Sequence, residues 1–274
     1  MQMYPQVDQI PETLQFFSSI KTTMATQLPV LLISGANQGL GYHASQILAR
    51  GGEYIILLGS RDPAKGQEAV KKIRQNPSTA PSTIIEPIQL DVNSDESIAS
   101  AVEYVSKTYG KLDILINNAA YSDIRQESEG GPSLRQIYRD QFETNFVSQG
   151  VMTDRFLPLL RKGSTPRIVF TSSGLGSFAI ASDPDSGPTK YLYMGYRSTK
   201  SALNMLALTY ANILKEDGIT VVIVCPGFCA TNLNDYAGIL EPSVGAEQIV
   251  KAATNGTHDE VSGTWVSEGG IMPW

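Results

Sequence analysis

The sequence has little cysteine and no run of basic residues. Its two cysteines, Cys225 and Cys229, lie four residues apart in one apolar stretch. With only His43 and His258 beside them they form neither a disulfide framework nor the four-ligand pattern of a zinc site. The 21 Lys and Arg residues against 27 Asp and Glu give a formal net charge of −6. A nucleic-acid-binding surface is therefore not expected, because it needs cations that neutralise phosphates.

Long apolar runs are also missing. No stretch approaches the roughly 20 consecutive apolar residues of a membrane-spanning helix. Residues 1–28 contain no Arg and no continuous apolar core, so they match neither a secretory signal nor a mitochondrial transit peptide. We therefore expect a cytoplasmic protein without a membrane or nucleic-acid partner. Its 274 residues divide into an N-terminal extension over 1–28 and one domain over 29–274.

Short apolar runs alternate with longer amphipathic ones from Pro29 onward. Near-continuous apolar strands separated by helices are typical of a parallel sheet covered on both faces. The sequence thus predicts an α/β fold, a single doubly wound Rossmann domain with a mainly parallel sheet of about seven strands. The expected strands are 30–33, 54–58, 84–90, 112–116, 167–171, 220–225 and 264–267.

A glycine-rich turn follows the first expected strand. It reads Ser34-Gly35-Ala36-Asn37-Gln38-Gly39-Leu40-Gly41. Glycines at this spacing let the backbone turn sharply and approach a pyrophosphate, and the next helix then points its N–H groups at the anion. No Gly-Lys-Ser/Thr follows, so the turn is not a Walker A loop. The pattern favours a dinucleotide site over a plain glycine-rich turn.

The end of the second strand indicates which dinucleotide is bound. An NAD-specific site commonly places a carboxylate here, whereas this chain has Ser60 and Arg61. Arg61 can pair with a 2′-phosphate, and Ser60 can add a hydroxyl donor. Asp62 comes before Pro63, which suggests that it caps the next helix. We therefore expect NADP(H), with a solvated surface charge as the alternative interpretation of Arg61.

Two further polar clusters end expected strands. Asp91-Val92 ends the third, where a side chain could reach the adenine amino group, and Asn117-Asn118-Ala119-Ala120 ends the fourth. Ligands of open α/β sheets bind beyond the carboxyl ends of the strands. Any one cluster could simply cap a loop, but their joint placement predicts a cofactor cleft along this edge.

The third group of candidates carries acid–base chemistry. Tyr196 and Lys200 are four residues apart and so share a helix face. A free tyrosine has a pKa near ~10, and a neighbouring ammonium with the cation of an oxidised nicotinamide would lower it. Ser173, after the fifth strand, can hold the substrate oxygen while Tyr196 passes it a proton. Alone, such a Tyr–Lys pair could be an ordinary surface pair.

Together these motifs resemble the short-chain dehydrogenase/reductase family, and the match covers nearly all of residues 29–274. The family's TGxxxGxG motif is present with Ser34 in place of Thr, and its NNAG motif with Ala120 in place of Gly. Within the family the chain is most similar to the carbonyl-reductase type. The turn Ser60-Arg61-Asp62 resembles that group's NADPH-selecting turn, and residues 265–274 resemble its tail.

The resemblance implies roles for individual residues. Ser173, Tyr196 and Lys200 fall on the catalytic positions, and Asn145 falls on that of the structural and proton-relay asparagine. The implied cofactor-binding residues, of which the last three belong to a PG motif with its later Thr, are Gly35, Asn37, Gly39, Leu40, Gly41, Ser60, Arg61, Asp91, Val92, Asn118, Ala119, Tyr196, Lys200, Pro226, Gly227 and Thr231.

The expected function is NADPH-dependent reduction of a ketone or aldehyde to an alcohol, with hydride from the nicotinamide and a proton from Tyr196. The stretch between Ser173 and Tyr196 is longer than the family's minimal spacing by roughly one loop, residues 183–190. That loop would shape substrate choice. A small-molecule partner is expected, and the protein could be a monomer or a homodimer. Aromatic side chains that could line the site and favour an apolar or aromatic substrate, or could equally serve ordinary packing, are Phe178, Tyr191, Tyr193, Phe228 and Tyr236.

Two other functions compete with reduction. A non-redox NADP(H)-binding protein would need no phenol beside an ammonium, so the intact Ser, Tyr, Lys and Asn set argues against it. A serine hydrolase of the α/β type is disfavoured because no serine has glycine both two residues before and two residues after it.

Overall fold

The computed structural model describes residues 28–123, 131–186 and 193–274. Eight strands form one sheet in the order β3-β2-β1-β4-β5-β6-β7-β8. Every neighbouring pair is parallel except β7 and β8. The strands are β1 (Val30–Ile33), β2 (Ile55–Ser60), β3 (Ile84–Gln89), β4 (Ile114–Asn117), β5 (Arg167–Thr171), β6 (Thr220–Val224), β7 (Thr264–Ser267) and β8 (Gly270–Ile271).

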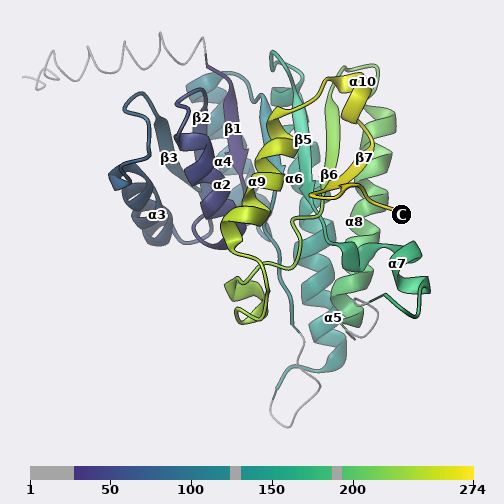
Figure 1. Ribbon diagram of the computed structural model, residues 1–274. Coiled ribbons are helices and arrows are strands. Elements are labelled where there is room, and N and C mark those ends of the chain that lie inside the picture. Colours follow the sequence, from purple (N-terminus) through teal and green to yellow (C-terminus); the bar gives the residue numbers. More distant parts are fainter. Residues whose placement is uncertain (1–27, 124–130, 187–192) are drawn as a thin grey trace, which may run out of the picture.

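Helices cover both faces of this sheet (Figure 1). One buried cluster joins one side of the central strands to α4, α6 and α8, and a second joins the other side to α2, α3 and α9. The helices are α2 (Gly39–Ala49), α3 (Pro63–Gln75), α4 (Asp95–Tyr109), α5 (Leu134–Phe142), α6 (Ser148–Leu160), α7 (Phe178–Ser182), α8 (Met194–Ile213), α9 (Pro242–Thr254) and α10 (His258–Val261), with the short turns η1 (Glu143–Val147), η2 (Gly174–Gly176) and η4 (Asn232–Asn234).

The doubly wound architecture is confirmed, and the sheet has one strand more than expected. Strand β8 has two residues, Gly270 and Ile271, and both are exposed. A strand of two residues is too short to show an alternation of apolar and polar residues, so the sequence pattern does not predict it. Between β4 and β5 the expected long helix is present as α5, a π-helical turn η1 and α6. Within the described residues, no helix is long and apolar enough to cross a bilayer.

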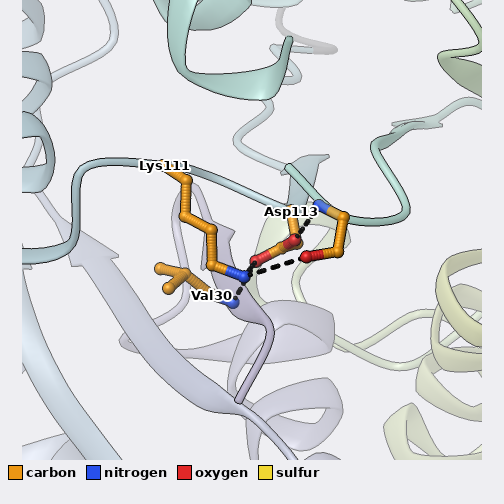
Figure 2. Close-up of polar contacts among 4 residues, drawn as sticks. Val30, Lys111 and Asp113 are labelled. Atoms are coloured by element: carbon orange, nitrogen blue, oxygen red, sulfur yellow. Dashed lines mark hydrogen bonds and ion pairs between the residues drawn. The ribbon is translucent and has the colours of Figure 1, made fainter. Parts of the chain in front are cut away.

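The amino end of the sheet is closed by a buried ion pair (Figure 2). The fully buried carboxylate of Asp113 accepts hydrogen bonds from the backbone N–H groups of Val30, at 2.8 Å, and Ser164, at 2.6 Å. The ammonium of Lys111 lies 2.9 Å from the same carboxylate. These contacts fix the starts of β1, β4 and β5 relative to one another. The candidate site lies at the opposite end of the sheet.

Candidate active site

A cleft of about 890 Å³ lies at the carboxyl ends of the strands. Segments that follow β1 to β6 contribute to its wall, together with the first turns of α8. Of the residues predicted from the sequence, Gly41 and Asn145 do not line it. Those that do are Gly35, Asn37, Gly39, Leu40, Ser60, Arg61, Asp91, Val92, Asn118, Ala119, Ser173, Tyr196, Lys200, Pro226, Gly227 and Thr231.

The glycine turn is fastened to the end of β4. The hydroxyl of Ser34 accepts hydrogen bonds from the N–H groups of Asn118 and Ala119, both at 3.0 Å. The serine that replaces the family's threonine thus supplies the hydroxyl contacts. Gly41 has a packing role, because a Cβ there would lie 2.7 Å from Asn118 Nδ2. It lets the helix and the strand end approach each other behind the cleft.

Helix α2 presents free donors to the cleft, unlike the two helices that follow it. Its N-cap residue Gln38 makes no side-chain capping hydrogen bond. By contrast, Asp62 caps α3 and Ser94 caps α4 with their side chains. The first N–H groups of a helix have no intrahelical acceptor, and with the helix dipole they attract an anion. The start of α2 is therefore suited to a phosphate group.

A cationic end lies beside the second strand. Arg61 and Lys65 are exposed and line the cleft, and neither forms an ion pair with any residue in the described part of the chain. Lys65 is not among the residues predicted from the sequence. Its position in the first turn of α3, close after Arg61, is the signal that could have predicted its place in the cleft. Asp62 accepts from the N–H groups of Ala64 and Lys65, which confirms its expected capping role.

Ser60 and Asp91 are already engaged by their own loops. The hydroxyl of Ser60 is 1% exposed and donates to the Asp62 carbonyl at 2.7 Å. Its proton is therefore committed, and the hydroxyl donor expected for a 2′-phosphate is not free. The Asp91 carboxylate accepts from the N–H of Asn93 at 3.1 Å. Asp91 nevertheless lines the cleft together with Val92.

Two adjacent serines at the end of β5 are told apart by their contacts. The Ser172 hydroxyl is buried and donates to Asn204 Oδ1 at 2.5 Å, which fixes it to α8. The Ser173 hydroxyl accepts from the N–H of Leu175 at 3.2 Å and lies in the cleft wall with its proton available. Ser173 is therefore the serine placed to donate to a bound oxygen.

Tyr196 and Lys200 lie on one face of α8, as their spacing predicts. The ammonium of Lys200 is 5.5 Å from the centre of the Tyr196 ring and donates to the Thr171 carbonyl at 2.8 Å. Burial lowers the pKa of Lys200 to about 8. Burial raises the pKa of the Tyr196 phenol, with a smaller contribution from Cys225. The protein groups alone therefore keep the phenol protonated, whereas the sequence analysis expected the neighbouring ammonium to favour phenolate.

This set of side chains on a doubly wound sheet can be compared with known proteins. The model of the short chain dehydrogenase family matches residues 29–238. The chain belongs to the short-chain dehydrogenase family. A curated relative, the short-chain dehydrogenase anuI of Penicillium roqueforti, is 41% identical over 248 residues, which cover 89% of this chain and 96% of the relative.

Other relatives place this short-chain dehydrogenase near the carbonyl reductases. The crystal structure of the NADPH-bound carbonyl reductase from chicken fatty liver superposes with a TM-score of 0.74 at 26% identity, over 90% of this chain and 99% of that chain. A (+)-neomenthol dehydrogenase of Arabidopsis thaliana is 28% identical over 293 residues, which cover 89% of this chain and 98% of that protein. The protein is a carbonyl-reductase-like member of an oxidoreductase family that binds nicotinamide cofactors.

In this short-chain dehydrogenase Asn145 lies behind the cleft wall, in the π-helical turn η1. Its side chain is fully buried, accepts from the Tyr121 N–H at 2.8 Å and donates to the Tyr121 carbonyl at 2.8 Å. Its second N–H reaches the Thr199 hydroxyl at 3.1 Å. Asn145 therefore ties the segment after β4 to the residue before Lys200. Single π turns are frequent at functional sites.

The aromatic residues separate into two groups. Tyr193 and Phe228 line the cleft, whereas Phe178 and Tyr236 are 70% and 69% exposed and do not. Tyr191 lies outside the described residues, as do residues 187–190 of the expected insertion. The cleft therefore has aromatic walls on the side away from Arg61.

Neither thiol is disulfide-bonded. Cys225 and Cys229 are both buried, as expected. Cys225 Sγ accepts from the Gly174 N–H at 3.1 Å, behind Ser173. Cys229 reaches the cleft, and burial raises its pKa to about 11. It is therefore an unreactive thiol at neutral pH.

Proposed function

We propose that the protein is an NADPH-dependent reductase that converts an apolar or aromatic ketone or aldehyde into an alcohol. The observation that carries the proposal is the single cleft that joins an uncapped helix start, a cationic end and the Ser173, Tyr196 and Lys200 side chains. Bound NADPH supplies a hydride to the carbonyl carbon. The remaining chemistry belongs to side chains of this chain.

The cofactor preference follows from the charges at one end of the cleft. Arg61 and Lys65 can both pair with a 2′-phosphate, and the carboxylate of Asp62 is committed to the start of α3. This turn therefore offers the cleft two cations and one carboxylate, whose Oδ1 already caps α3, and this balance favours a phosphorylated ribose. The NADPH-bound carbonyl reductase from chicken fatty liver supports the same choice by its similarity.

The proton comes from Tyr196. Because burial raises its pKa, the phenol is protonated at neutral pH, which is the state a proton donor requires. As the carbonyl carbon gains hydride, its oxygen takes the Tyr196 proton and the alcohol forms. The resulting phenolate is stabilised by the Lys200 ammonium, and solvent returns the proton. The Ser173 hydroxyl donates to the same substrate oxygen and so orients it.

The substrate class follows from the side of the cleft opposite the cationic end. Leu175, Tyr193 and Phe228 line it, and such surfaces favour an apolar or aromatic body. The similarity to a dehydrogenase of neomenthol, a cyclic alcohol, supports this choice.

The decisive experiment measures NADPH and NADH consumption over a panel of aliphatic, cyclic and aromatic ketones. We expect turnover with NADPH, and we expect Tyr196→Phe to lower kcat by about 1,000-fold while the variant still binds NADPH. Tyr42→Phe is the matched control, because Tyr42 lies on α2 and does not line the cleft. Tight NADPH binding with no turnover of any carbonyl would instead favour a non-redox NADP(H)-binding protein.

A further inference from the structure

Helix α7 follows the candidate active-site residues of β5 and η2 in the chain, and it buries none of its side chains. It spans five residues, Phe178–Ser182, and none of them is buried. A helix this short is unstable by itself, because its few hydrogen bonds do not offset the entropy lost in forming the first turn. Contacts from another part of the chain must therefore hold it.

Those contacts come from the last residues of the chain, almost one hundred positions away. The N–H of Ala179, in the first turn of α7, donates to the Trp274 carbonyl at 2.8 Å. The hydroxyl of Ser177 donates to the Pro273 carbonyl at 2.8 Å. The same hydroxyl accepts from the N–H of Ile180 at 3.0 Å and so caps the helix. The cap and the first turn of α7 are both fastened to the tail.

The tail is in turn fixed to the edge of the sheet. The N–H of Met272 donates to the carbonyl of Trp265 in β7 at 2.7 Å. The Trp274 ring lies with its centre 5.6 Å from that of Trp265, whose side chain is fully buried. Figure 1 shows the end of the chain beside α7. Residues 272–274, here called the C-terminal clasp, thus join α7 to the sheet.

Ser173 has supports of its own besides Met272 of the clasp, whose Cε would lie 3.4 Å from a Cβ on Gly174. The N–H of the next residue, Gly174, is held by Cys225 Sγ, and the Gly176 carbonyl accepts from the Ser201 hydroxyl at 2.9 Å. Gly176 packs so closely on α8 that a Cβ would lie 2.8 Å from the Lys200 carbonyl carbon. Loss of Pro273 and Trp274 would therefore leave Ser173 held in place, and the proposed proton donor Tyr196 lies on α8.

The segment that the clasp holds adjoins the substrate side of the cleft. Leu175 lines the cleft wall, and Ser177, whose hydroxyl donates to the clasp, also donates its N–H to the Gly174 carbonyl at 3.1 Å. Arg61 and Lys65, at the cationic end, belong to the distant β2–α3 turn. Movement of α7 would thus alter the wall that meets the substrate and leave the cationic end unchanged.

We propose that the C-terminal clasp, and Trp274 within it, positions the substrate wall and sets substrate affinity and selectivity. The inference rests on the proposed reductase function. Its residues are positioning residues, since they act through α7 and need not touch the substrate. The expected signature is a change in KM and in discrimination between ketones, with kcat and NADPH affinity preserved.

The test compares the full chain with a variant that ends at Met272, which removes both carbonyl acceptors. We expect KM for the preferred ketone to rise about tenfold, because each lost hydrogen bond contributes about two- to twelvefold and water replaces part of it. We expect kcat to stay within about twofold and the Kd of NADPH to be unchanged. Trp274→Ala should raise KM less, and Trp274→Phe should restore it, because an aromatic ring again packs on Trp265.

The matched control is Ile271→Ala, which alters an exposed apolar side chain next to the clasp. It should leave KM unchanged. Equal losses of kcat and NADPH affinity in the shortened chain would overturn the proposal, because they would mean a general loss of structure. An unchanged KM and unchanged selectivity would overturn it as well.

A second readout does not need turnover. Hydrogen exchange at the Ala179 amide, measured by NMR, should quicken in the shortened chain and stay slow in Ile271→Ala, because that N–H donates to Trp274. If the full chain reduces no carbonyl at all, the proposed function fails, whereas this exchange still tests the clasp. Unaltered exchange at Ala179 in the shortened chain would show that α7 is held by other contacts.

Discussion

The two ends of the parallel sheet use polar side chains in opposite ways. At the amino end the Asp113 carboxylate is fully buried and its contacts are internal: the N–H groups of Val30 and Ser164 and the Lys111 ammonium (Figure 2). A buried charge is tolerated only when its partners satisfy it. This end is therefore built for stability.

A second cation at the amino end repeats the pattern without any carboxylate. Arg167, which begins β5, is nearly buried and donates to the carbonyls of Ala252, Asn255 and Gly256 at 2.6–2.9 Å. These carbonyls lie at the end of α9, where the helix leaves its last acceptors unpaired. The guanidinium acts as the cap of that helix.

At the carboxyl end comparable groups are left available. The start of α2 has no side-chain cap, Arg61 and Lys65 form no ion pair within the described residues, and the Ser173 hydroxyl keeps its proton for a bound oxygen. Residue types alone do not distinguish the two ends, because both carry cations and hydroxyls. The difference lies in whether a protein partner satisfies them, and the unsatisfied end is the candidate active site.

The largest effect is expected at the amino end of the sheet, where a substitution should lower the stability of the fold and leave catalysis unchanged. Asp113→Ala leaves two N–H groups without partners and the Lys111 ammonium with only the Ser164 hydroxyl, so the free energy of unfolding should fall by about 4 kcal/mol. Urea unfolding measures this. The variant's kcat per folded molecule should match the unaltered protein. Glu68→Ala, which removes only an exposed ion pair with Lys72, should change stability little. A loss of kcat without a loss of stability in Asp113→Ala would contradict the division between the two ends.

Arg167→Met should come next, with a loss of about 2 kcal/mol in the free energy of unfolding. The methionine fills much of the space but leaves the terminal carbonyls of α9 without their donors. Thermal and urea unfolding would report it, and Arg155→Met, at an exposed position on α6, serves as the control. If the two variants were equally stable, the capping role assigned to Arg167 would be wrong.

Much of this arrangement is predictable from local sequence. The strands 30–33, 167–171 and 264–267 have the bounds expected, because each is a run of apolar or β-branched residues that ends at polar ones. Local sequence also predicts that Tyr196 and Lys200, at i and i+4, share a helix face, and that α3 begins at Asp62-Pro63. Patterns that repeat along a strand or helix suffice for these features.

What sequence reasoning misses depends on contacts between distant segments. Lys65 reaches the cleft because of the rotation of α3, and the Ser60 hydroxyl donates its hydrogen bond to the Asp62 carbonyl only once the turn has closed. Asn145 lies behind the wall because a π turn rotates it toward Tyr121. Neither periodicity nor a motif records these orientations, so they require the folded structure.

A smaller effect, on cofactor affinity, is expected at the cationic end of the cleft. Arg61→Ala and Lys65→Ala should each weaken NADPH binding about tenfold, because each removes a charge-assisted contact to the 2′-phosphate. NADH affinity should be almost unchanged. Isothermal titration with both cofactors measures the ratio, and Lys72→Ala, farther along α3, is the control. If Arg61→Ala weakened both cofactors equally, the proposed recognition of the 2′-phosphate would be wrong.

The smallest expected effect is a pH dependence at the centre of the cleft. Burial lowers the pKa of Lys200 to about 8, so its ammonium is present below that pH and is lost as the pH rises through it. If the ammonium helps to bind the cofactor, kcat/KM for NADPH, which reports groups of the free enzyme, should fall to half near pH 8. Tyr196 does not confuse the profile, because its raised pKa keeps it protonated there.

Cys225 supplies the control for that titration, because it is buried and acts electrostatically on both Tyr196 and Lys200. Cys225→Ser should therefore keep the fall near pH 8, whereas Lys200→Arg, with a cation that stays charged, should remove it. A fall that persists in Lys200→Arg would contradict the assignment of the titration to Lys200. The Lys200 ammonium would then stay charged through pH 8, and the carboxyl end would hold a permanent buried cation.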